Sequence, residues 1–540
     1  MAYLRIGSFG GVVKELSPRL LDQQYATDAE NVSTETGQIV PYRDTTFKKA
    51  LVLGSPTSLY RYTDNDWLEW AEDVDVVKTP IAFDSTDLIA FSGQDYPRIT
   101  RNDTALGAGR LPAASYRLGV PAPDIVPTVL ETSPSGDTDA LEQDRYYLYT
   151  WVDAWGREGP PSKPSAAVTT KDGSTVQVTM GPVPSGNYNF ASGALRRIYR
   201  ANTGSNATVF QFVTEVPITQ TSFDDTVQNS ALAELIPSVT WDGPPDDDVA
   251  LYPTGPMKGL CALPNGVLAG FTGRTLCFSA PYMPHAWPTD NRYPVPDEIV
   301  AIVPISAGLA VLTADKPCVA LGDDPGAISV QPLDKRQACV SKRSAVDMGD
   351  YAIYASPDGL IGVEGGNVRV LTDGLLTRDQ WRAYNPEQIH AYRYNGKYVA
   401  FTDTAGFIFT PGSDAAVAFM PLSITASGGY YDADEDQLYL LQGNEVRAFD
   451  AGSALSWTWT SKEFHHGWDV CFAAAQVDAV DYPVALDIVV DGQTTQVQAY
   501  DHEPFYIPLL TGRDWQVKLS GDMAVNSVAL ATSFGELSNA

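Results

Sequence analysis

The chain has 540 residues, of which 44% are hydrophobic and 11% aromatic, so it can form several cores, and its length favours three or four domains. Asp and Glu (66) outnumber Lys and Arg (36), which gives a formal net charge of −30. Carboxylates repel phosphates, so this charge argues against nucleic-acid binding through a basic surface. No apolar run reaches the about 18 residues of a membrane span, and "MAYLRIGSFGGVVKELSPRLL" contains no signal-peptide core. We expect neither a membrane span nor a cleaved export signal.

Residues 1–50 are predicted to form an N-terminal arm with a short helix. The stretch "LDQQYATDAENV", residues 21–32, places Leu21, Tyr25 and Ala29 at the i, i+4 and i+8 positions of one helical face. This spacing predicts a docking helix within the arm.

Nearly all of the remaining sequence reads as short strands separated by turns, with 44 Gly, 38 Pro and 27 Tyr. Residues 51–119 predict a first propeller blade. Residues 241–455 carry five further units with turns such as Asn265-Gly266 and Asp358-Gly359, and the units start roughly 40 to 50 residues apart, which is the period of propeller blades. We therefore expect an all-β fold built on a β-propeller of about six blades.

Two additional β modules are expected outside the blades. Residues 120–240 have the strand rhythm of an inserted fibronectin III-like β-sandwich, in which "RYYLYTWV" is a strand, Asp153 to Gly156 makes the turn and "GPPSKPS" crosses to the other sheet. Residues 456–540 predict a C-terminal β-sandwich with a hairpin turn at Asp491-Gly492.

The five cysteines stand singly in the sequence and predict neither a disulfide framework nor a zinc site. No CxxC pair occurs and the number is odd, so free thiols in a reducing compartment are expected. The positions are Cys261, Cys277, Cys318, Cys339 and Cys471.

Two acidic segments raise the question of cation binding. Asp432, Asp434 and Asp436 alternate within "DADEDQ", and alternate carboxylates in a loop can bind Ca²⁺. The Gly and distal Glu of an EF-hand loop are missing, so a solvated hairpin tip is favoured, and cation binding stays an open alternative. The segment "DGPPDDD", residues 242–248, is interpreted as a solvated acidic linker stiffened by proline, with metal binding as the remoter reading.

The sequence carries no motif of catalytic residues. "SPDGLIG", residues 356–362, resembles the Asp-containing turn of sialidase-like propellers but lacks the usual aromatic residue, and the sequence does not place Arg343, Arg369 or Arg393 around a common axis. None of the five histidines stands in an HExxH context. The sequence therefore predicts no catalytic residue, no cofactor and no metal ligand, and the protein is not expected to be an enzyme.

Several segments of the chain resemble those of a known group of proteins. The segments are "PRLLDQQYATDAENVSTETGQIVPYR", "WLEWAEDVDVVKTPIAFDSTDLIAFSGQDYPRIT", "LPAASYRLGVPAP", "LPNGVLAGFTGRTLCFSAPYMPHAWP" and the late "SKEF", "AQV" and "VDG". They resemble segments of tail proteins of short-tailed phages, namely the tail nozzle or tail tube class with its tubular protein B-like and packaged-DNA-stabilisation-like members. Together these segments touch most of the chain.

The resemblance implies a structural virion protein that is assembled in the host cytoplasm and located in the tail. It implies a homohexameric ring at the distal end of the tail, which docks on adaptor proteins, carries fibres or spikes, and retains and then passes genomic DNA without binding it specifically. The charge agrees with this role, because an acidic conduit lets DNA slide where a basic one would hold it.

Two other functions compete with the tail role. A carbohydrate-binding or sialidase-like surface protein involved in host adsorption would use aromatic platforms such as Trp67, Trp70 or Trp287, although tryptophans in strands are more often part of a core. An exported propeller scaffold unrelated to phages is disfavoured by the expected absence of a signal peptide.

Overall fold

The computed structural model describes residues 3–81, 83–202, 209–412 and 419–537. It is built almost entirely of β-strands, and the described residues divide into two compact units, Met1–Ala71, Val300–Val319 and Gln331–Ala540 in one, and Glu72–Ile299 and Ala320–Val330 in the other. The described α-helices are short: α1 (Asn102–Ala105), α2 (Arg378–Arg382) and α3 (Phe534–Leu537). No described helix has the length and hydropathy needed to cross a lipid bilayer.

In the described part of the chain, six four-stranded sheets outside the inserted module have the size of propeller blades, as the sequence predicted. The first two consist of β8 (Asp75–Lys78), β9 (Ile89–Ser92), β10 (Arg98–Thr100) and β11 (Tyr116–Arg117), and of β19 (Lys258–Ala262), β20 (Leu268–Thr272), β21 (Thr275–Phe278) and β22 (Arg292–Pro294). The next two consist of β23 (Ile299–Ile305), β24 (Gly308–Thr313), β25 (Cys318–Leu321) and β26 (Ser329–Pro332), and of β27 (Val346–Asp347), β28 (Ala352–Ser356), β29 (Gly359–Glu364) and β30 (Asn367–Val370). The last two consist of β31 (His390–Tyr394), β32 (Lys397–Phe401), β33 (Gly406–Phe409) and β34 (Phe419–Leu422), and of β35 (Gly428–Asp432), β36 (Gln437–Gln442), β37 (Glu445–Ala448) and β5 (Thr46–Ala50).

The last of these sheets takes its edge strand from the N-terminal arm, because β5 pairs with β37 in antiparallel register. The hairpin of β6 (Ser58–Arg61) and β7 (Trp67–Trp70) is a separate two-stranded sheet, so the first blade begins at β8 and not at the N-terminal end of the predicted blade region.

Residues 128–225 form the inserted fibronectin III-like sandwich. One sheet has three strands, β12 (Thr128–Ser133), β15 (Thr175–Thr179) and β18 (Ser222–Asp225). The other has four, β14 (Val168–Lys171), β13 (Glu142–Val152), β16 (Leu195–Asn202) and β17 (Gln211–Pro217). Their alternating inward side chains form one core that includes Tyr149, Trp151 and Ile198.

The segment "GPPSKPS" stays beside β13 and does not cross to the other sheet, contrary to the sequence-based expectation. The backbone N–H groups of Gly159, Ser162 and Ser165 donate to carbonyls of β13 at 2.8–2.9 Å, and the prolines occupy positions between these donors. The residues between the prolines donate to the free carbonyls at the edge of β13. Proline lacks an N–H, so the segment leaves few backbone donors of its own unpaired.

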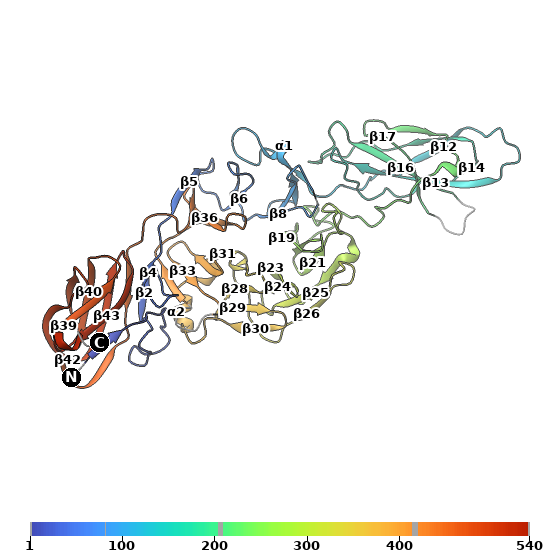
Figure 1. The fold of residues 1–540 in the computed structure, drawn as a ribbon. Helices are drawn as coiled ribbons and strands as arrows, with labels where there is room; N and C mark the ends of the chain where they lie inside the picture. The colour runs from blue at the N-terminus through green and yellow to red at the C-terminus, as the bar shows by residue number, and fades with distance from the viewer. Residues whose placement is uncertain (1–2, 82, 203–208, 413–418, 538–540) are drawn as a thin grey trace. The chain divides into compact units, whose positions relative to one another are not determined.

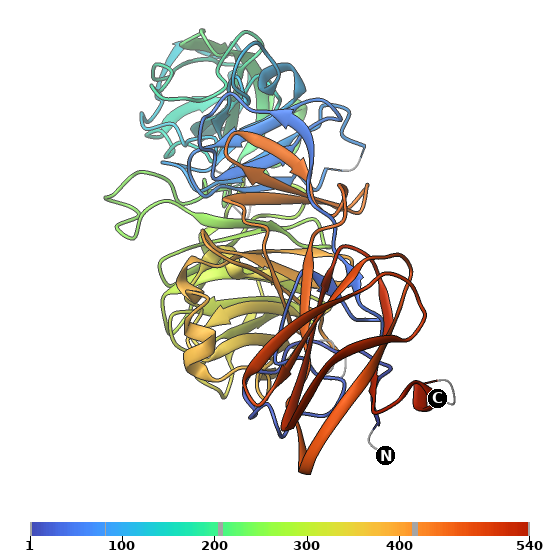
Figure 2. The same cartoon turned by 90° about the vertical axis from the view of Figure 1, so that its left-hand side faces the viewer.

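The C-terminal module is one eight-stranded sheet, which also contains the two first strands of the chain. Its strands are β1 (Tyr3–Ile6), β43 (Val525–Ala531), β39 (Phe464–Ala479), β42 (Phe505–Gly521), β38 (Trp457–Thr460), β2 (Asp28–Glu30), β40 (Val484–Val490) and β41 (Gln493–Ala499). The long strands β39 and β42 change partners along their length through bulges, which lets the sheet curl over its own core. Figures 1 and 2 both show the two chain ends at this sheet.

The predicted helix over residues 21–32 is wrong. Residues 28–30 form β2, which pairs with β38, and β3 (Val32–Ser33) pairs with β4 (Val40–Pro41). Leu21 and Ala29 are both buried, but in different cores, so their spacing reflects two separate contacts of an extended arm. Sheet pairing supplied by distant strands has overridden a weak local periodicity.

Candidate binding pocket

Two linkers connect the inserted sandwich to the blades of its own unit, and they pass very close to one another. A Cβ atom on Gly119, in the entering linker, would lie 2.7 Å from Cδ of Pro244 in the leaving linker. Only glycine permits this approach, since real Cβ atoms do not come so near to another heavy atom.

The turn after β13 fixes the sandwich to the first blade. Asp153 Oδ1 accepts hydrogen bonds from the backbone N–H groups of Trp155 and Arg157, both at 2.9 Å, while its Oδ2 accepts from Arg157 Nε at 2.8 Å. The turn so formed directs Arg157 Nη1 to the carbonyl of Leu118 at 2.8 Å and packs the Trp155 ring edge-on against Tyr116. The turn formed by residues 153–156, Asp-Ala-Trp-Gly, therefore serves to join two modules.

A buried histidine completes this joint. His285 is 6% exposed, and its Nε2 lies 3.1 Å from the carbonyl oxygen of Glu158, which can only accept, so Nε2 carries the proton. Burial, and to a smaller extent the nearby Arg157 guanidinium, lower the pKa of His285 to about 3. The ring is therefore neutral at physiological pH and acts as a structural donor.

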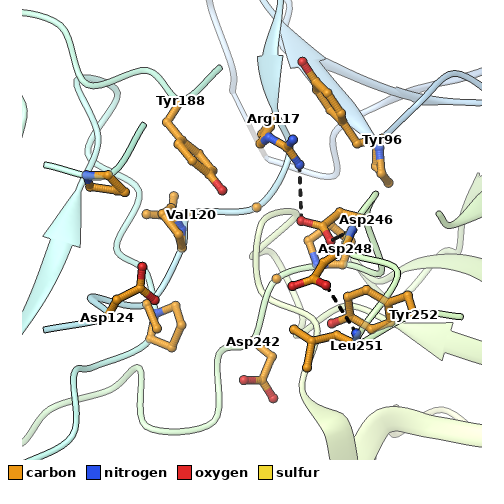
Figure 3. Close-up of a pocket in the computed structure, with 18 of the residues that line it drawn as sticks. Tyr96, Arg117, Val120, Asp124, Tyr188, Asp242, Asp246, Asp248, Leu251 and Tyr252 are labelled. Atoms are coloured by element: carbon orange, nitrogen blue, oxygen red, sulfur yellow. Dashed lines mark hydrogen bonds and ion pairs between the residues drawn. The ribbon is translucent and has the colours of Figure 1, made fainter. Parts of the chain in front are cut away.

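A pocket of about 590 Å³ lies beside this joint, at the point where the two linkers meet the sandwich (Figure 3). It is lined by three tyrosines, five prolines, one arginine and four aspartates, together with small and aliphatic residues. These residues are Tyr96, Pro97, Arg117, Gly119, Val120, Pro121, Ala122, Asp124, Pro160, Pro184, Ser185, Tyr188, Asp242, Gly243, Pro244, Asp246, Asp248, Leu251 and Tyr252.

Arg117 is held in one wall by aromatic and acidic neighbours. Its guanidinium carbon lies 3.8 Å from the ring centroid of Tyr96 and 5.6 Å from that of Tyr188. Its two terminal nitrogens donate to the two carboxylate oxygens of Asp247 at 2.8 and 3.0 Å, and Nη1 also lies 3.2 Å from Asp246. The arrangement combines a bidentate ion pair with stacking on tyrosine, which is the geometry that suits arginine rather than lysine.

The carboxylates of the pocket differ in their surroundings. The hydrogen bonds from Arg117 hold the pKa of Asp247 below its usual value, whereas burial raises the pKa of Asp246. Asp242 accepts a hydrogen bond from the hydroxyl of Thr289 at 2.7 Å. Asp248 accepts from the backbone N–H of Ala250 at 2.9 Å and thereby shapes the leaving linker. Figure 3 shows the side chains of Asp124 and Asp242 across the pocket from Arg117.

The tryptophans proposed as sugar platforms lie in cores. Trp67 and Trp70 are 3% and 2% exposed, and Trp67 packs edge-on against Tyr439. Trp287 is fully buried, and its indole N–H donates to the carbonyl of Pro284. None of the three presents a ring face to solvent, so the structure does not bring them together as a binding surface.

The three alternating aspartates do not converge. Asp432 accepts from Arg61 at 2.6 Å and from the backbone N–H of Asp434 at 3.0 Å, while Asp436 accepts from the hydroxyl of Tyr431 at 2.7 Å. Across the ranges that the structure describes, no three His, Cys, Asp or Glu side chains are grouped as metal ligands.

The remaining residues singled out in the sequence have separate surroundings. Arg343 donates to the carbonyls of Thr57 and Ser427, both at 3.0 Å, and Arg369 lines a smaller cavity of about 210 Å³ with Tyr351. Arg393 lies near Asp347, and it opposes the effect of burial, which raises the pKa of this carboxyl. His390 is buried, and its Nε2 lies 2.7 Å from the carbonyl of Ala426.

His465 pairs with Asp514 at the surface, His466 packs edge-on against Phe472, and His502 lies 3.2 Å from Glu503. The five cysteines are all free thiols.

Sequence reasoning missed the pocket, because its residues come from five separated segments. The acidic run at residues 242–248 is the one signal that could have indicated it, and it was interpreted as a solvated linker. The structure shows that Asp246 and Asp247 of this run are paired with Arg117.

No family model and no curated protein matches the sequence. Among solved structures, the chain is similar to the extracellular domain of a one-component system from B. thetaiotaomicron, with 10% identity, a TM-score of 0.29, and coverage of 86% of this chain and 47% of that chain. It is also similar to a gluconolactonase from Xanthomonas campestris, with 11% identity, a TM-score of 0.24, and coverage of 46% of this chain and 81% of that chain. The chain thus spans about half the length of the first of these structures. Such low TM-scores carry no functional argument, and the fold assignment rests on the sheets described above.

Proposed function

We propose that the protein is a structural component of the tail of a short-tailed phage, in which several copies of the chain assemble into a ring that conducts DNA. The observation that carries the proposal is that three large apolar side chains are exposed on two paired strands of the C-terminal sheet. Trp468 of β39 and Tyr506 and Leu509 of β42 are 69%, 78% and 76% exposed. Large apolar side chains that are exposed in the single chain are typical of surfaces that another protein covers.

Two further features support a scaffold role. The N-terminal arm supplies strands to the C-terminal sheet and to the last blade, so β1, β2 and β5 are each held within a sheet by strands from much later in the sequence. The formal charge of −30 per chain would make an assembled conduit repel DNA phosphates, which favours passage over binding. Hexameric copy number and docking to adaptors and fibres follow from the segment resemblance.

The test is the oligomeric state of the purified full chain, measured by light scattering after size exclusion and by negative-stain imaging. We expect rings with a central opening, and we expect Trp468→Ser combined with Leu509→Ser to shift the chain toward monomer. Leu141→Ser is the matched control, because Leu141 is an equally apolar side chain, 87% exposed, in the inserted sandwich.

A chain that stays monomeric at high concentration, alone and with its tail neighbours, would contradict the proposal. Saturable glycan binding by the isolated chain would instead favour the carbohydrate-binding alternative, which no longer has the tryptophan platforms on which it rested.

A further inference from the structure

We propose that the pocket between the two linkers binds an arginine or lysine side chain presented by a partner polypeptide. The inference does not depend on the proposed tail role. It rests on the shape of the pocket, on its charge and on the way in which it already holds one guanidinium.

The charge of the lining is strongly unbalanced. Four aspartates, Asp124, Asp242, Asp246 and Asp248, face one arginine, Arg117. Within the described ranges Arg117 is the one cation ion-paired with a pocket carboxylate, and it engages Asp246. Arg292 lies close by, but its Nη2 is directed to the carbonyls of Gly243 and Trp287 and to the hydroxyl of Tyr252. A ligand that enters the pocket therefore meets uncompensated negative charge.

The walls suit the rest of a basic side chain. Tyr188 and Tyr252 line the pocket with aromatic rings, to which a guanidinium or ammonium is attracted, and each ring already lies near one guanidinium of the chain, that of Arg117 at 5.6 Å and that of Arg292 at 5.4 Å. Prolines provide apolar surfaces for a methylene stem, and Leu251, at 69% exposure, offers a contact for an apolar residue next to the basic one. A volume of about 590 Å³ is within the common range for sites that enclose a ligand.

Arg117 is an example, within the pocket itself, of a guanidinium bound by an aromatic ring and carboxylates. It is stacked on Tyr96 and bonded to aspartates of the leaving linker, so one wall of the pocket is itself an aromatic and carboxylate clamp on a guanidinium. Asp124 and Asp242 lie on the other side of the pocket (Figure 3), where an incoming cation could pair with them. A partner polypeptide is favoured over a bare metal ion, because no three carboxylates of the described residues are grouped as metal ligands and the aromatic and proline walls add no oxygen ligand.

The test uses saturation-transfer NMR on the full chain at low ionic strength, with N-acetyl-L-arginine methylamide as probe and N-acetyl-L-citrulline methylamide as its uncharged isostere. We expect a signal from the arginine probe, little from citrulline, and at least a fivefold loss of the arginine signal in Asp124→Asn combined with Asp242→Asn. Asparagine keeps the size of both side chains, and circular dichroism verifies folding. Asp139→Asn, which removes one exposed charge from the sandwich outside the pocket, should bind as the wild type does.

Equal signals from arginine and citrulline, or an unchanged signal in the double variant, would overturn the proposal. Displacement of the arginine probe by micromolar CaCl₂ would also overturn it and assign the pocket to a metal ion. Loss of binding at raised salt is expected, because screening weakens ion pairs that remain near water.

Discussion

Arg200 Nη1 donates to Asp225 Oδ2 at 2.6 Å inside the inserted sandwich, and both side chains are completely buried. Asp225 Oδ2 also accepts from the hydroxyl of Tyr147 at 2.7 Å, and Arg200 Nη1 donates to the carbonyl of Val227 at 2.9 Å. The pair thus joins β16 to β18 across the two sheets, and both terminal nitrogens of Arg200 donate to neighbouring groups of the protein.

Breaking this pair should be costly. We expect Arg200→Met to lower the free energy of unfolding by about 3–5 kcal/mol, because it leaves Asp225 charged and buried without its partner. Arg200→Met combined with Asp225→Leu should recover much of that loss, since no buried charge remains. Urea unfolding followed by tryptophan fluorescence measures both variants, and a single variant as stable as the wild type would show that the pair is dispensable.

The close approach of the two linkers gives a second prediction. We expect Gly119→Ala to destabilise the sandwich-bearing unit by about 1–3 kcal/mol, because the added methyl group collides with Pro244. Gly136→Ala is the control, since nothing lies within 4 Å of a Cβ atom there, and it should change stability by less than about 0.5 kcal/mol. Thermal unfolding of both variants checks the difference, and equal melting temperatures would refute the steric account.

Acid should weaken the joint through His285. Its pKa is about 3 in the folded chain and about 6.5 when unfolded, so the unfolded state binds more protons between these values. Stability is therefore complete above pH 6.5 and falls as the pH drops toward 3, by about 2–3 kcal/mol between pH 8 and pH 4.5. His285→Gln, which can still donate to Glu158, should remove this part of the pH dependence. The readout is the free energy of unfolding of both proteins across this range, and parallel pH curves would count against a role for His285.

The hairpin of β6 and β7 is tied to the last blade by Arg61, which contacts Asp432 at 2.6 Å and Glu435 at 2.8 Å. We expect Arg61→Met to lower the free energy of unfolding by about 1–3 kcal/mol, because Asp432 is nearly buried while Glu435 is partly in water.

Since Asp432 is already engaged by Arg61, millimolar Ca²⁺ should leave the melting temperature of the wild type unchanged. A clear rise with Ca²⁺ but not with Mg²⁺ would instead establish the cation site that the sequence left open.

The parts of the fold that depend on local turn chemistry could be predicted from the sequence. Gly266 and Gly492 take positive φ angles at hairpin turns, so their Asn-Gly and Asp-Gly pairs indicated where strands reverse. Pairing between distant segments could not be predicted, because nothing local to residues 46–50 specifies β37 as their partner. The same reason explains the failed helix, whose residues pair with strands encoded at the other end of the chain.

The candidate pocket could not be predicted from the sequence, for a related reason. The sequence "DGPPDDD" does not distinguish a carboxylate that faces water from one that is paired with a guanidinium. Only the close passage of Gly119 and Pro244 brings that run beside Arg117 and Tyr188. Composition indicated that the segment is acidic. Only the tertiary structure shows that its carboxylates line a pocket beside Arg117.

The pairing of β1 with β43 sets an order of events during synthesis. Residue 3 finds its partner only at residue 531, so the first strand emerges from the ribosome long before its neighbour exists. The sandwich, with all of its strands between residues 128 and 225, can fold while translation continues. The C-terminal sheet can close only once synthesis has passed residue 531, and until then the apolar face of β1 needs protection from premature association.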